Sequence, residues 1–124
     1  MQQQGARAYQ QVARQTVSPR DLEANLLSKS ASRFQRIRDD WTRENRDLFA
    51  ALQFNRRLWN IFLNSVTRED SVLPRDVREN VANLGVFVLK HSLAVQIEPA
   101  APKLDVLINI NREVAAGLRA GANL

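Results

Sequence analysis

Residues 18–40, SPRDLEANLLSKSASRFQRIRDD, contain the clearest helix signal in the chain. Ser18 is a residue type that caps helix N-termini through its hydroxyl, and Pro19 suits the first helical position because the N–H that it lacks has no partner there. Asp21 places a carboxylate in the first turn, near the positive end of the helix dipole. Apolar residues follow at spacings of three and four, at Leu22, Leu26, Leu27, Ala31, Phe34, Ile37 and Trp41. The pattern predicts a helix that begins at Pro19 and ends near Asp40.

Similar patterns on both sides of this stretch predict the rest of the fold. Upstream, residues 5–16 predict a short helix with a weakly apolar face made by Ala6, Tyr9, Ala13 and Thr16. Downstream, residues 42–66 predict a second long helix, and Pro74 opens another. The Pro-rich segment 98–102 must be a connector, so a last helix follows it and frays at Gly117 and Gly121.

Glycine and proline are sparse, with four of each in 124 residues, which favours helices over a sheet protein that needs frequent turns. The length is that of one domain with one core. We therefore expect an all-α fold, a single domain over residues 1–124 built as a small bundle of four to five helices. Residues 1–17 are predicted to form a short, movable N-terminal helix, because a helix of that length is marginal alone.

Three predicted helices each carry one polar residue in an otherwise apolar stripe: Asn55, His91 and Asn111. An unpaired buried polar group costs about 1–3 kcal/mol, so these side chains should bond to each other, to a backbone group or to water. One interpretation is that they fix the register of the helices, as a buried Asn does in coiled coils. The other is that some of them line a groove, where a partner helix completes their hydrogen bonds. Between the stripes, the run 84–89 is apolar around the whole helix, which predicts a central position for that helix.

Composition narrows the classes of function. There is no cysteine, which excludes disulfides and thiolate metal sites and is compatible with a reducing cytosol. The longest apolar run, residues 84–89, is far shorter than the roughly 20 residues that cross a bilayer, and no signal peptide is readable, so we expect no membrane insertion. The net charge of +5 suits an acidic partner, although a small excess of arginine accounts for much of it.

Nothing in the chain resembles catalytic machinery. There is a single histidine, no Gly-rich phosphate loop and no Ser nucleophile motif. Carboxylates cluster at Asp39, Asp40, Glu44 and Asp47, but the three aspartates each have an arginine three or four positions away and Glu44 lies between Arg43 and Arg46, as in solvated ion pairs. We expect no enzyme activity, no cofactor, no bound metal and no small-molecule substrate.

Nucleic-acid binding is the strongest rival to a protein-binding role. Basic and aromatic residues are interleaved between positions 33 and 46, at Arg33, Phe34, Arg36, Arg38, Trp41, Arg43 and Arg46. Such a mixture is typical of phosphate contact combined with base stacking. However, acids alternate with these arginines and the aromatic residues fall on the apolar stripe, which favours core packing under a charged surface.

Several blocks of residues occur in an order that points to a known family. They are Ala8-Tyr9, SPRDLE at 18–23, ALQFNRRLW at 51–59, Leu73-Pro74 followed by NLGVFV at 83–88, and LININ at 107–111 followed by Gly117-Leu118. Together these blocks resemble the FlaF family of flagellar biosynthesis regulators, of the alphaproteobacterial type, over nearly the whole chain. The stretches 33–46 and 98–102 depart from the pattern.

The resemblance implies a cytoplasmic, non-enzymatic factor that binds flagellin, supports its synthesis and export as an export chaperone would, and acts with the regulator FlbT. It leaves open a post-transcriptional regulator that contacts flagellin messenger RNA directly or through FlbT. The densest match predicts partner contacts at Asn55, Arg56, Arg57 and Trp59, with Tyr9 as a further contact or a hinge anchor. The helical spacing of Trp59 is also that of a core residue, which would be buried and make no partner contact.

Overall fold

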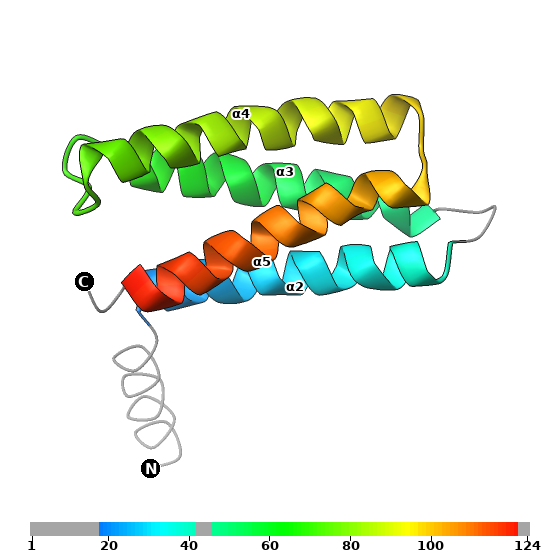
Figure 1. The fold of residues 1–124 in the computed structure, drawn as a ribbon, viewed down its shortest axis with the longest axis horizontal. Helices are drawn as coiled ribbons and strands as arrows, with labels where there is room; N and C mark the ends of the chain where they lie inside the picture. The colour runs from blue at the N-terminus through cyan, green and yellow to red at the C-terminus, as the bar shows by residue number, and fades with distance from the viewer. Residues whose placement is uncertain (1–17, 42–45, 122–124) are drawn as a thin grey trace, which may run out of the picture.

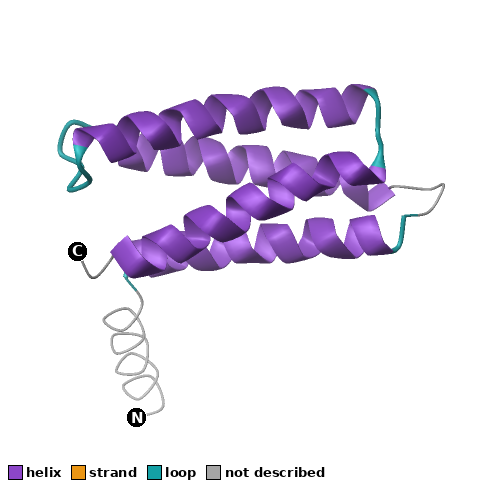
Figure 2. Ribbon diagram, in the orientation of Figure 1, coloured by secondary structure: helices purple, strands orange, loops and turns teal. Residues whose placement is uncertain are grey.

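The computed structural model describes residues 18–41 and 46–121, which form four α-helices. They are α2 (Pro19–Asp39), α3 (Arg46–Val66), α4 (Arg75–Ile97) and α5 (Leu104–Gly121), with a 3-10 turn η1 (Ala101–Lys103) before α5 (Figure 1, Figure 2). Successive helices run in opposite directions. The prediction of an all-α bundle is confirmed. The predicted helix over residues 5–16, with Tyr9, lies outside the described residues.

The start of α2 matches its sequence signal. Ser18 is the N-cap, and its Oγ accepts a hydrogen bond of 3.0 Å from the backbone N–H of Asp21. Pro19 occupies the first helical position. Pro74 stands at the N-cap of α4, and the 98–102 segment separates α4 from α5 as expected. Gly117 was wrongly expected to mark a fraying end, because α5 continues through it to Gly121.

The helices pack as two antiparallel pairs that share one core. α2 lies beside α5, α3 lies beside α4, and α3 also packs on α2 (Figure 1). The largest fully buried side chains are Trp59, Phe34 and Phe62, and the Trp59 and Phe62 rings meet edge to face with centroids 5.5 Å apart. Leu27, Leu48, Leu104 and Leu107 complete the centre. The largest of these side chains come from α2, α3 and α5, and α4 adds the smaller buried side chains Val88 and Val95.

The prediction that α4 is the central helix is wrong. Val86 and Phe87, inside the apolar run 84–89, are 51% and 43% exposed. α4 packs on α3 through the opposite side, where Gly85 is buried and a Cβ built on it would overlap the side chain of Leu63. The run 84–89 is therefore apolar on two faces for different reasons: one face packs against α3 and the other is exposed at the surface.

None of the helices within residues 18–41 and 46–121 combines the length and the apolar composition needed to cross a membrane.

Candidate functional site: a buried polar layer and the surface around it

A layer of hydrogen-bonded polar side chains joins three helices inside the core. Asn55 of α3 and Asn111 of α5 have no exposed surface. The Asn55 Oδ1 accepts hydrogen bonds from the Asn111 Nδ2 at 2.8 Å and from the Ser30 Oγ of α2 at 2.9 Å. The Asn111 Oδ1 accepts a hydrogen bond from the Trp59 Nε1 at 2.9 Å. We call these four residues, Ser30, Asn55, Trp59 and Asn111, the polar layer.

The donors and acceptors of the polar layer have a single consistent order. An indole N–H only donates, so Trp59 fixes the Asn111 carbonyl oxygen toward itself and directs the Asn111 amide nitrogen toward Asn55. Asn55 must then present its oxygen, and its Nδ2 is left buried without a hydrogen-bond partner among the described residues. Because each bond requires its partners at one height along the helices, the layer fixes the register of α2, α3 and α5.

This arrangement decides between the two interpretations of the polar stripe for the asparagines. Asn55 and Asn111 bond to each other, as a register-fixing pair would. Both are fully enclosed, so a partner helix cannot complete their hydrogen bonds while the bundle keeps this packing. For these two residues, the groove interpretation is therefore wrong in this conformation.

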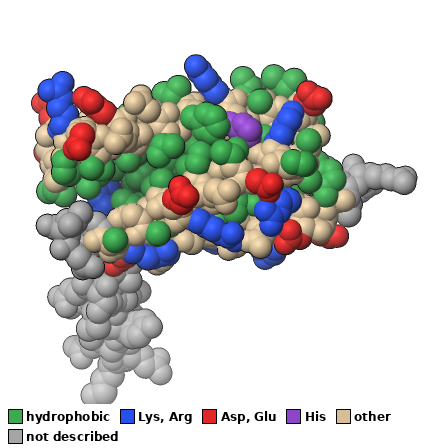
Figure 3. Space-filling model, in the orientation of Figure 1, with side chains coloured by type: hydrophobic (Ala, Val, Ile, Leu, Met, Phe, Trp, Pro, Cys, Tyr) green, Lys and Arg blue, Asp and Glu red, His purple; other side chains and the backbone are tan. Residues whose placement is uncertain are grey.

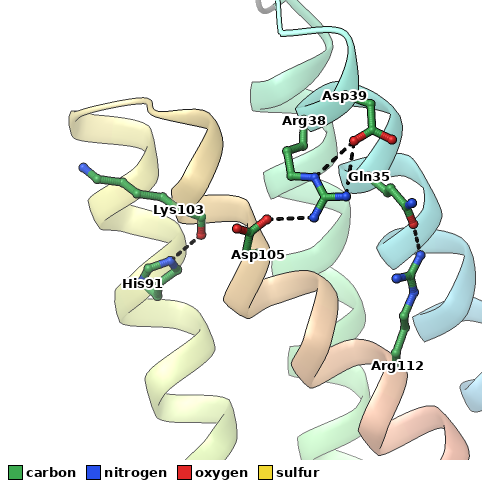
Figure 4. Close-up of polar contacts among 7 residues, drawn as sticks. All are labelled: Gln35, Arg38, Asp39, His91, Lys103, Asp105 and Arg112. Atoms are coloured by element: carbon green, nitrogen blue, oxygen red, sulfur yellow. Dashed lines mark hydrogen bonds and ion pairs between the residues drawn. The ribbon is translucent and has the colours of Figure 1, made fainter.

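His91 does not belong to the polar layer. It is half-buried near the end of α4, with its Nε2 2.7 Å from the carbonyl oxygen of Lys103 in η1 (Figure 4). Because a carbonyl only accepts, the Nε2 carries the proton of this bond. The imidazole also stacks on the ring of Phe87, with centroids 5.4 Å apart and an interplanar angle of 13°. His91 therefore attaches α4 to the connector before α5.

The structure separates the predicted partner contacts into buried and surface residues. Asn55 and Trp59 are core residues with no exposed surface. Arg57 is exposed and Arg56 is half-buried. Of the predicted contacts on α3, only these two arginines reach the surface, while Tyr9 lies outside the described residues.

Charged and polar side chains connect α2 to α5 along their length. Arg38 bonds to Asp105 at 2.7 Å and to Asp39 at 3.2 Å, and Arg112 bonds to Gln35 (Figure 4). The bond to Asp105, and then the bond to Asp39, raise the pKa of the Arg38 guanidinium. Nearer the other end, Arg119 donates to Asn25 at 3.0 Å and to Ser28 at 3.1 Å.

The described part of the Arg-rich stretch resembles a charged surface over a core. Phe34 is fully buried, so its ring is not free to stack on a base in this packing, and Trp41 is half-buried with one side against the core. Arg38 already pairs with two carboxylates. Arg43 lies outside the described residues. These placements weaken the support for direct RNA contact.

Sequence reasoning missed one surface. Five large apolar side chains of α4 are exposed: Val77 near its start, and Val86, Phe87, Leu93 and Ile97 farther along. The apolar run 84–89 includes two of these residues, but its composition alone predicts burial on all sides and does not distinguish a buried face from an exposed one. Among the described residues, no three His, Asp or Glu side chains gather as a metal site.

These features define a class of protein: a small all-α bundle with a hydrogen-bonded polar layer in its core and an exposed apolar surface that no other described helix covers. The family model for flagellar protein FlaF matches residues 5–118. The chain belongs to the FlaF family. No curated protein and no solved structure matches it significantly.

Proposed function

We propose that this protein is a cytoplasmic regulator of flagellum biogenesis that binds flagellin and supports its synthesis and export, acting with FlbT. The observation that carries the proposal is the match to the FlaF family over residues 5–118, which is nearly the whole chain. The role is that of an export chaperone rather than of an enzyme. It requires a surface that recognises a polypeptide, and no reacting group.

Two features of the bundle support a polypeptide-binding role. Exposed apolar side chains occur on α4, and large exposed apolar patches are typical of interaction sites. The net charge of +5 favours an acidic partner. A chaperone of this kind would hold a segment of flagellin as an amphipathic helix against its own helices and so prevent early polymerisation.

The test is the mass of the complex with unpolymerised flagellin, measured by light scattering after size exclusion at about 0.05 M and 0.5 M salt. Binding through apolar helix contacts should survive the higher salt, whereas phosphate-driven binding falls steeply with salt. A salt-tolerant complex of one protein with one flagellin supports the proposal. Absence of a complex at both salt concentrations would overturn direct flagellin binding.

The same experiment with flagellin messenger RNA, with and without FlbT, addresses the alternative of post-transcriptional control. Arg33 and Arg36 of α2 are the described arginines of the basic stretch that lack an ion pair to a described carboxylate. An RNA complex that forms at the lower salt concentration and dissociates at the higher one, together with no flagellin complex, would favour the alternative.

A further inference from the structure

An apolar strip runs along the outer side of α4. Val86, Leu93 and Ile97 fall within a sector of about 40° around the helix, and Phe87 lies at its flank. Their exposed fractions are 51%, 52% and 76%, and 43% for Phe87. Figure 3 shows hydrophobic side chains gathered over α4 and along its boundary with α5. We call Val86, Phe87, Leu93 and Ile97 the α4 apolar face.

The rest of α4 holds this face in place. The buried side of the helix consists of Gly85, Val88, Ser92 and Val95. At Gly85 the backbone lies against Leu63 of α3, and the Ser92 hydroxyl is satisfied by the Val88 carbonyl at 2.6 Å. His91 fixes the far end to η1. The face is therefore presented by a well-anchored helix, as a binding surface requires.

The charge within the face is positive. Lys90 is exposed and lies one turn after Val86 and one turn before Leu93. Residues 80–97 contain no Asp or Glu to pair with it, and Glu98, which follows Ile97, pairs with Lys103 instead. A segment that covers this face must bury apolar side chains and offer a carboxylate to Lys90, because a buried unpaired ammonium is costly.

Charge complementarity also selects among possible occupants. A second copy of this chain, paired symmetrically over the face, would bring two Lys90 ammonium groups into one interface without a carboxylate from residues 80–97. Residues 1–17 contain Arg7 and Arg14 and no Asp or Glu, so this segment offers no partner to Lys90 either. An acidic amphipathic helix from another protein fits both requirements.

We propose that the α4 apolar face binds an amphipathic helix with an acidic residue opposite Lys90, and that this helix belongs to flagellin. The inference rests on the proposed function for the identity of the partner. It assigns the contact to α4, away from the Asn55 and Trp59 positions that the sequence favoured. The partner's apolar residues would pack on Val86, Leu93 and Ile97 as one helix packs on another.

The test compares two leucines of equal exposure. Leu93 on α4 and Leu22 on α2 are both 52% exposed. Leu93→Asp should weaken the binding of monomeric flagellin, measured by calorimetry, by at least about tenfold. Leu22→Asp, the matched control, should bind within about twofold of the unaltered protein. Circular dichroism verifies that both variants keep their helix content.

Substitutions of Lys90 provide a second, independent test, because they change the charge of the face and leave its apolar side chains in place. Lys90→Glu should weaken flagellin binding several-fold, and the loss should shrink as salt rises, because the added repulsion is screened. Lys90→Arg keeps the charge and should bind as the unaltered protein does. This pair of variants remains informative if Leu93→Asp fails to fold.

The outcomes separate the two proposals. If the unaltered protein binds flagellin, and Leu93→Asp and Lys90→Glu bind it as tightly, the assignment of the binding site to the α4 apolar face is overturned. The proposed function then stands. If the unaltered protein does not bind flagellin at all, the proposed function is overturned and the occupant proposed for the face falls with it. Selective loss in both α4 variants supports both proposals.

Discussion

The two sides of the bundle use the same kind of amphipathic helix in different ways. α2 and α5 lie against each other along their length, and polar bonds such as Arg38 to Asp105 and Arg119 to Asn25 hold their outer edges together. α4 packs mainly on α3 and leaves its other apolar face, including Leu93 and Ile97, in solvent.

The difference teaches that apolar pattern alone does not say what a helix packs against. On α2, the centre of the apolar stripe, with Leu27 and Phe34, is enclosed within the chain, and only Leu22 at its start is exposed among the large apolar side chains of the helix. On α4, part of an equally apolar pattern remains at the surface, where its burial would stabilise a complex rather than the fold. The predictions below test this division.

The largest effect should separate two phenylalanines, one from each side. Phe34→Ala removes a fully buried ring of α2 and should lower the free energy of unfolding by about 3–5 kcal/mol, through lost burial and the cavity left behind. Phe87→Ala removes a 43% exposed ring of α4 and should cost less than about 1 kcal/mol. Urea unfolding followed by circular dichroism measures both. Equal losses would contradict the division.

A smaller effect is expected in the polar layer. Asn111→Ala leaves the Trp59 Nε1 buried without an acceptor and removes one of the two hydrogen bonds to the Asn55 Oδ1, which should cost about 2–3 kcal/mol. The matched control, Asn109→Ala, changes an exposed residue of the same helix and should stay within about 0.5 kcal/mol of the unaltered protein. Thermal unfolding of both variants gives the comparison. A mild Asn111→Ala phenotype would mean that the layer contributes little to register.

Two helical glycines should respond in opposite directions. Gly85→Ala adds a methyl group that overlaps the Leu63 side chain, so either that side chain or the two helices must shift, and we expect a loss of about 1–2 kcal/mol. At Gly117, a Cβ would meet nothing within 4 Å, so Gly117→Ala should stabilise α5 by about 0.5–1 kcal/mol through helix propensity. Urea unfolding measures both. Stabilisation by Gly85→Ala would show that the α3–α4 contact is looser than described.

The smallest effect concerns the pH dependence of α2. Burial raises the pKa of the Glu23 carboxyl above its ordinary value of 4.5, and the ion pair with Arg20 offsets only part of this shift. A carboxyl whose pKa is raised by folding contributes stability at pH below its unfolded pKa, and that contribution is lost as pH rises through the folded pKa.

Glu23→Gln, which keeps a neutral side chain at every pH, should therefore stabilise the protein at pH 7 by less than about 0.5 kcal/mol, because solvent screens a half-buried group. The gain should vanish below about pH 4. Glu113→Gln, on an exposed part of α5, is the control for loss of one charge. Destabilisation by Glu23→Gln at pH 7 would show that the pair with Arg20 dominates instead.

Local signals made most of the fold predictable. The start of α2 depends on Ser18 and Pro19, whose effect is confined to one helical turn, so the sequence alone defined it. The asparagines at positions 55 and 111 were also identified from helical spacing, because a polar residue on an apolar stripe must find a partner. Their actual bonds, including the one from Trp59, depend on how three helices meet and were not predictable from one stripe.

The candidate surface was harder to predict for a physical reason. Helical periodicity shows which residues avoid water, but the same apolar side chains can be covered by the chain itself or by another protein. His91 shares the spacing of a core residue, yet it lies at the level of η1 and bonds to Lys103. Its role depends on where the connector after α4 runs, and the spacing of residues within α4 gives no information on that path.

The one-way order of donors and acceptors in the polar layer has an evolutionary consequence. Trp59 only donates, so loss of its N–H leaves the Asn111 oxygen unpaired. Loss of the Asn111 amide leaves the Trp59 N–H unpaired, while the Asn55 oxygen keeps its bond from Ser30. Removal of either Trp59 or Asn111 alone therefore adds an unpaired polar group to the core. Chains that descend from a common ancestor with this one should keep Asn55, Trp59 and Asn111 together, or replace them together by a fully apolar set.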